Sequence, residues 1–134
     1  MVRKFTYRGY TIEELQTMPM DEFIKIIPSR PRRSLLRGLP NRQKKFLEKL
    51  RRARRALKKG KKIVIRTHNR DSIITPEMIG VSVAVHNGLE FIEFTITPEH
   101  VGHYLGEFAP TRKKVIHGNP GLGATKSSQY VPLK

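Results

Sequence analysis

The sequence contains no cysteine and no tryptophan, and its 11 acidic residues are far outnumbered by 27 lysines and arginines. The absence of cysteine excludes disulfide bonds and thiolate metal sites, and it favours a cytoplasmic protein over a small secreted scaffold. No run approaches the roughly 20 apolar residues of a membrane span, and we expect no signal peptide in the opening MVRKFTYRGY. A length of 134 residues predicts one compact body with extensions.

The formal net charge of +16 is concentrated in one part of the chain. Residues 30–62 hold sixteen basic residues and a single acid, Glu48. A surface charged only for solubility mixes both signs, so this concentration indicates a polyanionic partner, with nucleic acid first. Phosphate attraction does not separate RNA from DNA, so a DNA-binding or DNA-compacting protein is the alternative. Binding to an anionic membrane ranks below both, because the basic helix has no tryptophan and a narrow apolar stripe.

Short helices are expected before residue 30. Thr11 and Glu14 have the spacing of a capping box at the start of one helix. A second helix carries Phe23 and Ile27 on one face, and Pro28 closes it because the residue before a proline is pushed out of the helical region.

A longer, basic helix is predicted over residues 42–59, capped by Asn41 and ended by Gly60. Its apolar residues recur at intervals of four, three and four, which places them on one stripe: Phe46, Leu50, Ala53 and Leu57. Six basic residues of this helix have only Glu48 as a nearby partner, so their charges repel along the helix. We predict that these six contact phosphates: Arg51, Arg52, Arg54, Arg55, Lys58 and Lys59.

After residue 62 the apolar period changes to two, which predicts a strand at 61–67 and a hairpin over 80–96. Asn87-Gly88 predicts a two-residue type I′ turn with His86 opposite Leu89. One face of this hairpin is apolar apart from Glu90: Val81, Val83, Val85, Ile92, Phe94 and Ile96. The other face is mixed and can meet a helix or an RNA surface: Ser82, Ala84, His86, Leu89, Phe91, Glu93 and Thr95.

Two heptapeptides, ITPEMIG at 74–80 and ITPEHVG at 96–102, echo each other. In each, the threonine can cap a turn, the proline suits its first position, and the glutamate complements the positive helix end. The echo predicts two uses of one helix start rather than a repeat fold. A short helix follows the second copy, and we expect Gly106 to end it.

The segment GNPGLGATKSS at 118–128 has the glycine spacing of a phosphate-binding loop but not its chemistry. Ala124 and Thr125 stand where that loop needs its lysine and hydroxyl, and we do not expect the helix that such a loop requires, since Pro132 lies in the segment after it. We predict an extended basic tail instead, with Lys126 as a phosphate contact and Tyr130 as a stacking group.

Catalysis and cofactors are not expected. His100 and His103 lack a third metal ligand, and no acidic cluster suits Mg²⁺ or Ca²⁺. Glu99 and Glu107 supply no matched nucleophile, base and orienting group. The sequence therefore predicts no enzyme activity, no cofactor, no metal and no small-molecule substrate.

A specific resemblance is carried by HNGLEFIEFTITPEHVGHYLGEFAPTR, residues 86–112. This run resembles the signature of the universal small-subunit ribosomal protein numbered nineteen in bacteria and fifteen in eukaryotes. IRTHNRDSIITPEMIG, residues 65–80, is similar to the family's strand and turn, although Thr67-His68-Asn69 departs from the aromatic-containing bacterial version. The flanks at 5–18, 32–39 and 117–134 resemble only the archaeal and eukaryotic branch, and an archaeal-type member is the narrower expectation.

The resemblance implies an α/β (α+β) fold, with a small antiparallel sheet whose central hairpin is packed by short helices. A basic, helical N-terminal extension (1–62) precedes the family body (63–114), and an extended C-terminal tail (115–134) follows it. The implied role is that of a structural constituent of the small ribosomal subunit, which binds rRNA in the head beside the protein numbered thirteen. The tail is implied to reach toward the decoding site and A-site tRNA.

Further RNA contacts are expected in loops and in the tail, where side chains reach RNA that a sheet face cannot. Asn87 and Gly88 are turn formers first. The expected contacts are Arg66, His68, Asn69, Arg70, His86, Asn87, Gly88, His103, Arg112, Lys113, Lys114 and Lys126.

Overall fold

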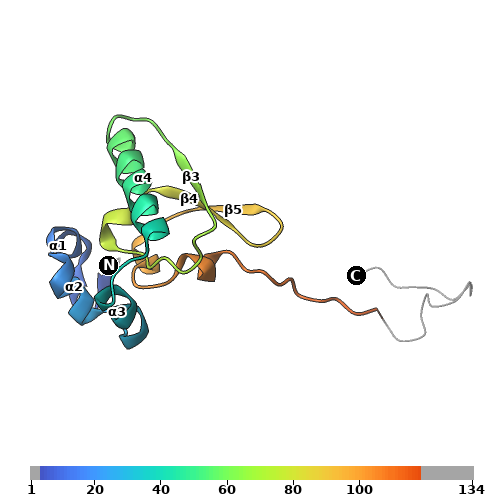
Figure 1. Cartoon of the computed structure of the whole chain (residues 1–134), viewed down its shortest axis with the longest axis horizontal. Helices are drawn as coiled ribbons and strands as arrows, with labels where there is room; N and C mark the ends of the chain where they lie inside the picture. The colour runs from blue at the N-terminus through green and yellow to red at the C-terminus, as the bar shows by residue number, and fades with distance from the viewer. Residues whose placement is uncertain (1–3, 119–134) are drawn as a thin grey trace, which may run out of the picture.

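Four α-helices, a two-stranded hairpin and a three-stranded sheet make up residues 4–118, which are the residues that the computed structural model describes (Figure 1). The predicted α+β fold class is confirmed. The helices and strands are β1 (Thr6–Tyr7), β2 (Tyr10–Thr11), α1 (Ile12–Thr17), α2 (Met20–Ile26), α3 (Ser29–Leu36), α4 (Asn41–Lys58), β3 (Val64–Thr67), β4 (Ser82–His86) and β5 (Phe91–Thr95). Three short 3₁₀ helices follow β3 and β5, namely η1 (Pro76–Met78), η2 (Pro98–His100) and η3 (Leu105–Phe108).

The N-terminal helices form a second, smaller core at one end of the molecule, to which the body contributes Val101 and Ile79 (Figure 1). The predicted capping box at the start of α1 is confirmed, since the backbone N–H of Thr11 donates to Glu14 Oε2 over 2.7 Å. This hydrogen bond and that of the Thr11 side chain hold the pKa of Glu14 below its ordinary value. Helix α3 was not anticipated, because Pro31 discourages a helix although a proline is tolerated in the first turn.

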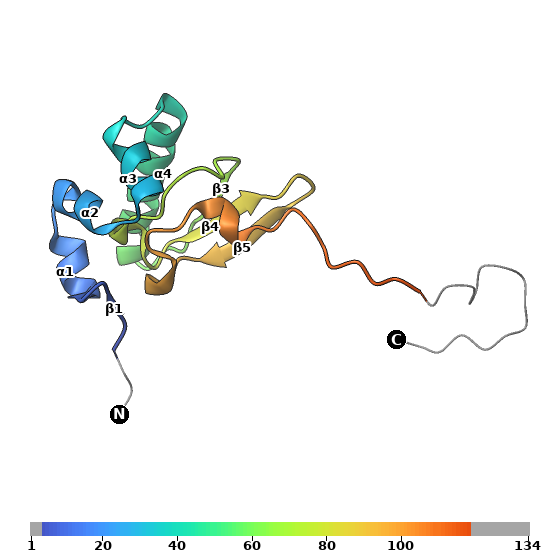
Figure 2. The same ribbon diagram turned by 90° about the horizontal axis from the view of Figure 1, so that it is seen from below.

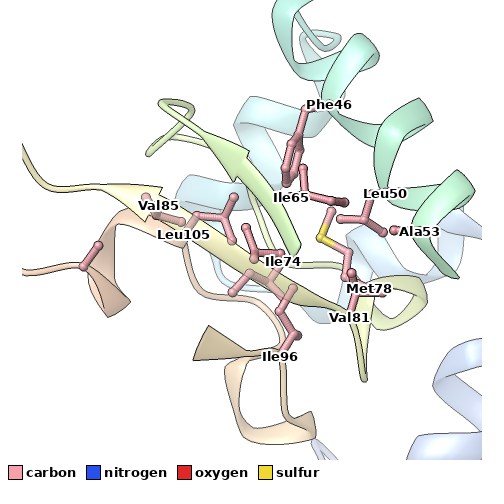
Figure 3. Close-up of a cluster of buried hydrophobic side chains, with 12 residues drawn as sticks. Phe46, Leu50, Ala53, Ile65, Ile74, Met78, Val81, Val85, Ile96 and Leu105 are labelled. Atoms are coloured by element: carbon pink, nitrogen blue, oxygen red, sulfur yellow. The ribbon is translucent and has the colours of Figure 1, made fainter. Parts of the chain in front are cut away.

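Helix α4 packs its apolar stripe into the main core, against the sheet (Figure 3). Phe46, Leu50 and Ala53 are at most 4% exposed, whereas Leu57 is 39% exposed, so the stripe ends one turn earlier than predicted. The predicted cap at Asn41 is wrong: Asn41 is the first helical residue and Pro40 holds the capping position. The predicted end at Gly60 is confirmed.

Gly60 ends α4 because it adopts a positive φ of 79°. Its N–H donates to the carbonyl of Leu57 over 2.9 Å, and the N–H of Lys61 donates to Ala56 over 3.0 Å. This pair of bonds is the Schellman arrangement, which satisfies the last carbonyls of a helix. The basic helix is therefore terminated by its own local sequence.

The main sheet has the order β3-β4-β5 and is mixed. Strand β3 pairs with β4 in parallel and β4 pairs with β5 antiparallel, so the sheet differs from the all-antiparallel arrangement that was expected. The parallel pair arises because the chain crosses back through η1 before entering β4. Core residues come from one face of the sheet, from α4, and from Leu105 and Ala109 near η3 (Figure 3).

The predicted register of the β4–β5 hairpin is wrong by two residues. His86 pairs with Phe91, and Val85 with Ile92, so residues 87–90 form a four-residue loop instead of a two-residue turn. The loop is longer because the side chain of Asn87 accepts the N–H groups of Leu89 and Glu90 over 2.9 and 2.8 Å. A shift of two preserves the alternation of strand faces, so the predicted apolar face remains the core face.

The two echoing heptapeptides hydrogen-bond to each other reciprocally. The N–H of Gly80 donates to the carbonyl of Ile96 over 2.8 Å, and the N–H of Gly102 donates to the carbonyl of Ile74 over 3.0 Å. Each isoleucine is at most 1% exposed, and both glycines have positive φ. The capping prediction holds for Thr97, but the side chain of Thr75 makes no cap hydrogen bond within the described residues. The two heptapeptides thus form a pair of similar turns that are joined by these two hydrogen bonds.

The described chain after Ala109 is extended and exposed. Figures 1 and 2 both show it leaving the body at the end where the β4–β5 hairpin turns, opposite to the N-terminal helices. Gly106 does not end the preceding helix as predicted, because it lies inside η3. The tail residues Lys126 and Tyr130 lie outside the described residues.

Candidate nucleic-acid interface

The solvent face of α4 carries the largest group of predicted phosphate contacts. Of the six residues that were predicted to contact phosphates here, five are exposed and Arg54 is half-buried. Arg51 donates to Glu77 over 3.4 Å, an ion-pair partner 26 residues away that the sequence pattern could not reveal. For the others, no ion pair within 4 Å joins them to the residues described: Arg52, Arg54, Arg55, Lys58 and Lys59.

A shallow hollow of about 250 Å³ lies on this face between α4 and η1. Four cationic side chains and one carboxylate line it: Arg51, Arg54, Arg55, Lys58 and Glu77. A second hollow of about 320 Å³ lies between α4 and β3, and its lining combines Lys49, Arg52 and Arg66 with the apolar residues Ala53, Ile63, Val64 and Ile65. Concave surfaces lined by guanidinium and ammonium groups are suited to phosphate oxygens. The basic face therefore continues from the helix onto the edge of the sheet.

The sheet brings Arg66, His68 and His86 together on the face opposite to its core. The rings of His68 and His86 lie 4.6 Å apart, centroid to centroid. Both also contact the ring of Phe91, at 5.2 and 4.9 Å, and the guanidinium of Arg66 lies 5.7 Å from the same ring. Phe91 was not predicted as a site residue, although the alternation of the hairpin had placed it on the same mixed face as His86.

Arg70, predicted to contact RNA, directs its guanidinium into the protein. Its Nη1 donates to the carbonyl of His86 over 2.7 Å, and its Nη2 donates to the carbonyls of Gly106 and Ala109 over 2.8 and 2.7 Å. The side chain thereby ties the hairpin loop to the start of the tail. The structure gives Arg70 a positioning role within the protein.

Two further predicted contacts also have structural partners. The Asn69 side chain donates to the carbonyl of Arg42 over 3.2 Å, and Arg42 itself forms an ion pair with Asp71. His103 is exposed and its Nδ1 lies 2.6 Å from Glu107 Oε2. These contacts order the loop after β3 and the turn before η3, and the side chains stay partly accessible.

The remaining predicted residues divide between the hairpin loop and the tail. Asn87 and Gly88 are the first two residues of the four-residue loop 87–90, with Gly88 at φ 107°. Arg112, Lys113 and Lys114 are exposed on the extended segment that leaves the body beside this loop (Figure 2). The basic face of α4 lies beside η1 and the start of β3, whereas the hairpin loop and the tail base lie at the other end of the sheet (Figure 1).

Among residues 4–118, no three histidine, aspartate or glutamate side chains are placed to hold a metal ion. None of the helices within that range combines the length and the apolar character needed to cross a membrane.

A comparison with known protein families matches residues 33–117 to the family described as Ribosomal protein S19. The chain belongs to this family. The match covers more than half of the chain, from α3 to the described part of the tail, and includes both echoing heptapeptides. Ribosomal protein S19 is a structural component of the small ribosomal subunit, associated with rRNA and other ribosomal proteins. Membership therefore gives this chain a structural rather than a catalytic role in translation.

Proposed function

We propose that this S19-family chain binds rRNA in the head of the small subunit, neutralising phosphates so that the RNA packs closely. The observation that carries the proposal is the division of α4 into two faces. Phe46, Leu50 and Ala53 anchor one face in the core, while the opposite face presents cations that lack ion pairs among the described residues. Such a helix is held rigidly by its apolar side and is free to meet phosphates with the other.

Neighbours in the subunit are part of the same proposal. The protein numbered thirteen lies beside this chain in the head, and the C-terminal tail extends toward the decoding site and A-site tRNA. The direction in which residues 110–118 leave the body, together with exposed Arg112, Lys113 and Lys114, supports a tail that follows RNA. Similarity of the flanking segments at 5–18 and 117–134 supports an archaeal-type member.

A salt series tests phosphate neutralisation. We expect the affinity of the full chain for a head-domain rRNA fragment to fall steeply with salt, and the Arg52→Gln/Arg55→Gln variant to have a shallower slope. Each lost phosphate contact should reduce the slope by roughly 0.7 to 0.9. Lys4→Gln/Lys25→Gln is the matched control, because it removes two exposed charges that lie outside the basic segment 30–62 and should leave the slope nearly unchanged. A flat dependence, or equal effects of both pairs, would contradict the proposal.

Cofractionation separates RNA binding from the DNA-binding alternative. Sedimentation with small subunits that is lost on RNase treatment supports the proposal, whereas retention that is lost on DNase treatment supports DNA binding. For the tail, deletion of residues 119–134 should leave the body folded and assembled while disturbing tRNA selection. Normal decoding by ribosomes that carry the deletion would refute the role of the tail.

A further inference from the structure

The sheet face opposite to α4 carries an exposed cluster of rings at the ends of three strands. Parallel and antiparallel pairing align Arg66 with Ala84 and Glu93, so the next residues on this face are His68, His86 and Phe91. The three rings lie within 5.2 Å of one another, centroid to centroid. His68 is exposed and Phe91 is 36% exposed, so the rings are accessible to a ligand.

Phe91 belongs to neither of the two hydrophobic cores. Its ring instead receives the guanidinium of Arg66, which reaches it from β3 across the intervening strand. The small side chain of Ala84 allows this crossing and is itself only 3% exposed. A large aromatic ring that contacts a cation and two imidazoles at the surface stabilises the fold less, through burial of apolar area, than the same ring would in the core. The arrangement leaves the side chain of Phe91 36% exposed beside a positive charge.

We propose that His68, His86 and Phe91 form a stacking site for one unpaired RNA base, with Arg66 holding an adjoining phosphate. The inference rests on the proposed function, because it assumes that the chain binds RNA. Bases in a duplex are stacked on each other, whereas bases in loops and bulges can splay out onto aromatic side chains. Stacking tolerates any base, since every base presents a π face. The ligand class is therefore a single-stranded loop or bulge rather than a helix.

Charge on the flanks orients the RNA backbone. Glu93 lies on the β5 side of the cluster and disfavours phosphates there. On the β3 side, the hollow shared by Lys49, Arg52 and Arg66 supplies cations. The sugar-phosphate chain thus runs along β3 toward α4, and the base projects from it onto the rings. One ligand then joins the ring cluster to the basic helix.

The test uses the full chain and an RNA hairpin that carries 2-aminopurine in its loop, with the same label in the stem as the comparison. Binding should quench the loop label and leave the stem label largely unchanged. Phe91→Leu removes the ring but retains an apolar side chain, and Phe91→Tyr restores the ring. We expect Phe91→Leu to abolish the quenching and weaken loop binding about tenfold, with duplex binding changed less than twofold. Phe91→Tyr should recover both.

Two outcomes overturn the inference. Quenching that survives Phe91→Leu means that the base stacks elsewhere, and equal losses for loop and duplex mean that the residue acts through general affinity. The variant Arg52→Gln/Arg55→Gln tests the proposed function separately from the stacking site. It should lower the affinity for both the loop and the duplex RNA, but the loop label should still be quenched when the RNA is saturating. If wild-type protein binds neither RNA with salt dependence, the proposed function fails. If the wild-type protein binds RNA with salt dependence but Phe91→Leu changes neither quenching nor loop binding, the stacking site is refuted and the proposed function stands. Thermal unfolding of each variant verifies that it is folded.

Discussion

Arg70 and Gly106 hydrogen-bond to each other twice. The N–H of Gly106 donates to the carbonyl of Arg70 over 2.9 Å, and Nη2 of Arg70 donates back to the carbonyl of Gly106 over 2.8 Å. A Cβ atom added to Gly106 would lie 3.0 Å from both the Cβ and the carbonyl oxygen of Arg70, so any larger residue here would require Arg70 to shift by a few tenths of an ångström. The pair joins the loop after β3 to the turn from which the tail departs.

Replacement of Arg70 by lysine should lower the free energy of unfolding by about 2 to 4 kcal/mol. A lysine ammonium cannot reproduce the planar fork that reaches three carbonyls, and it leaves at least one of them unsatisfied. Arg66→Lys is the matched control, because Arg66 is exposed and its recorded contact is the ring of Phe91. That control should cost about 1 kcal/mol or less. Denaturant unfolding measures both free energies, and equal effects would argue against a stabilising role of the three hydrogen bonds from Arg70.

Gly102→Ala should destabilise the protein and loosen the N-terminal hairpin. Gly102 has φ 84°, which costs a non-glycine residue about 1 to 2 kcal/mol, and its added Cβ would lie 2.6 Å from the hydroxyl oxygen of Tyr7. In a Tyr7→Phe background the steric part of the loss should shrink, while the backbone part remains. A double-mutant cycle by thermal unfolding measures this coupling. Strict additivity of the two substitutions would show that Tyr7 simply moves aside.

Stability should fall as the pH drops through 6.5, in part because of His100. Burial lowers the pKa of His100 below its ordinary value of 6.5, against the effect of Glu99, and Nδ1 accepts the N–H of Thr97 over 3.3 Å. The unfolded chain therefore binds the proton more readily than the folded chain, so the free energy of unfolding decreases with falling pH. His100→Gln keeps an acceptor for the cap without a titrating group. Unfolding between pH 7.5 and 5 should show a smaller decrease for this variant, and parallel curves would exclude the mechanism.

Substitutions on the two faces of α4 should affect different properties, namely stability on the buried face and RNA affinity on the exposed face. Leu50 is fully buried, so Leu50→Ala should lower the free energy of unfolding by about 2 to 5 kcal/mol. Arg52→Ala on the exposed face should change it by about 0.5 kcal/mol or less and instead reduce RNA affinity. Calorimetry and RNA titration of the same two proteins check the division. A stable Leu50→Ala variant would mean that α4 is not anchored by its apolar stripe.

Local signals identified the basic helix, its end and the first capping box. Each depends on residues within one or two helical turns, such as Thr11 with Glu14 or Gly60 with Leu57, so neighbouring side chains suffice to specify it. Alternation likewise assigned the hairpin residues to their faces, because a two-residue error in register does not change which face a residue occupies.

The candidate site was only partly predictable. Sequence placed Arg66, His68 and His86 near RNA, but only the observed register pairs Phe91 with His86, and only the parallel pairing of β3 with β4 brings Arg66 and His68 to the same ring. Arg51 was predicted to be unpaired and has an ion pair with Glu77. These contacts depend on the path of the chain between strands, which no local pattern reports.

The sequence by itself determined that α4 forms a helix, which side of it is apolar and where the positive charge is concentrated, because these follow from residue type and short-range periodicity. Tertiary structure alone decided that the two echoing heptapeptides hydrogen-bond to each other and that Arg70 serves three carbonyls. Those partners lie 16 to 39 residues from Arg70 along the chain. A guanidinium has the same charge whether it meets solvent, phosphate or protein, so only the packed fold determines which of these it contacts.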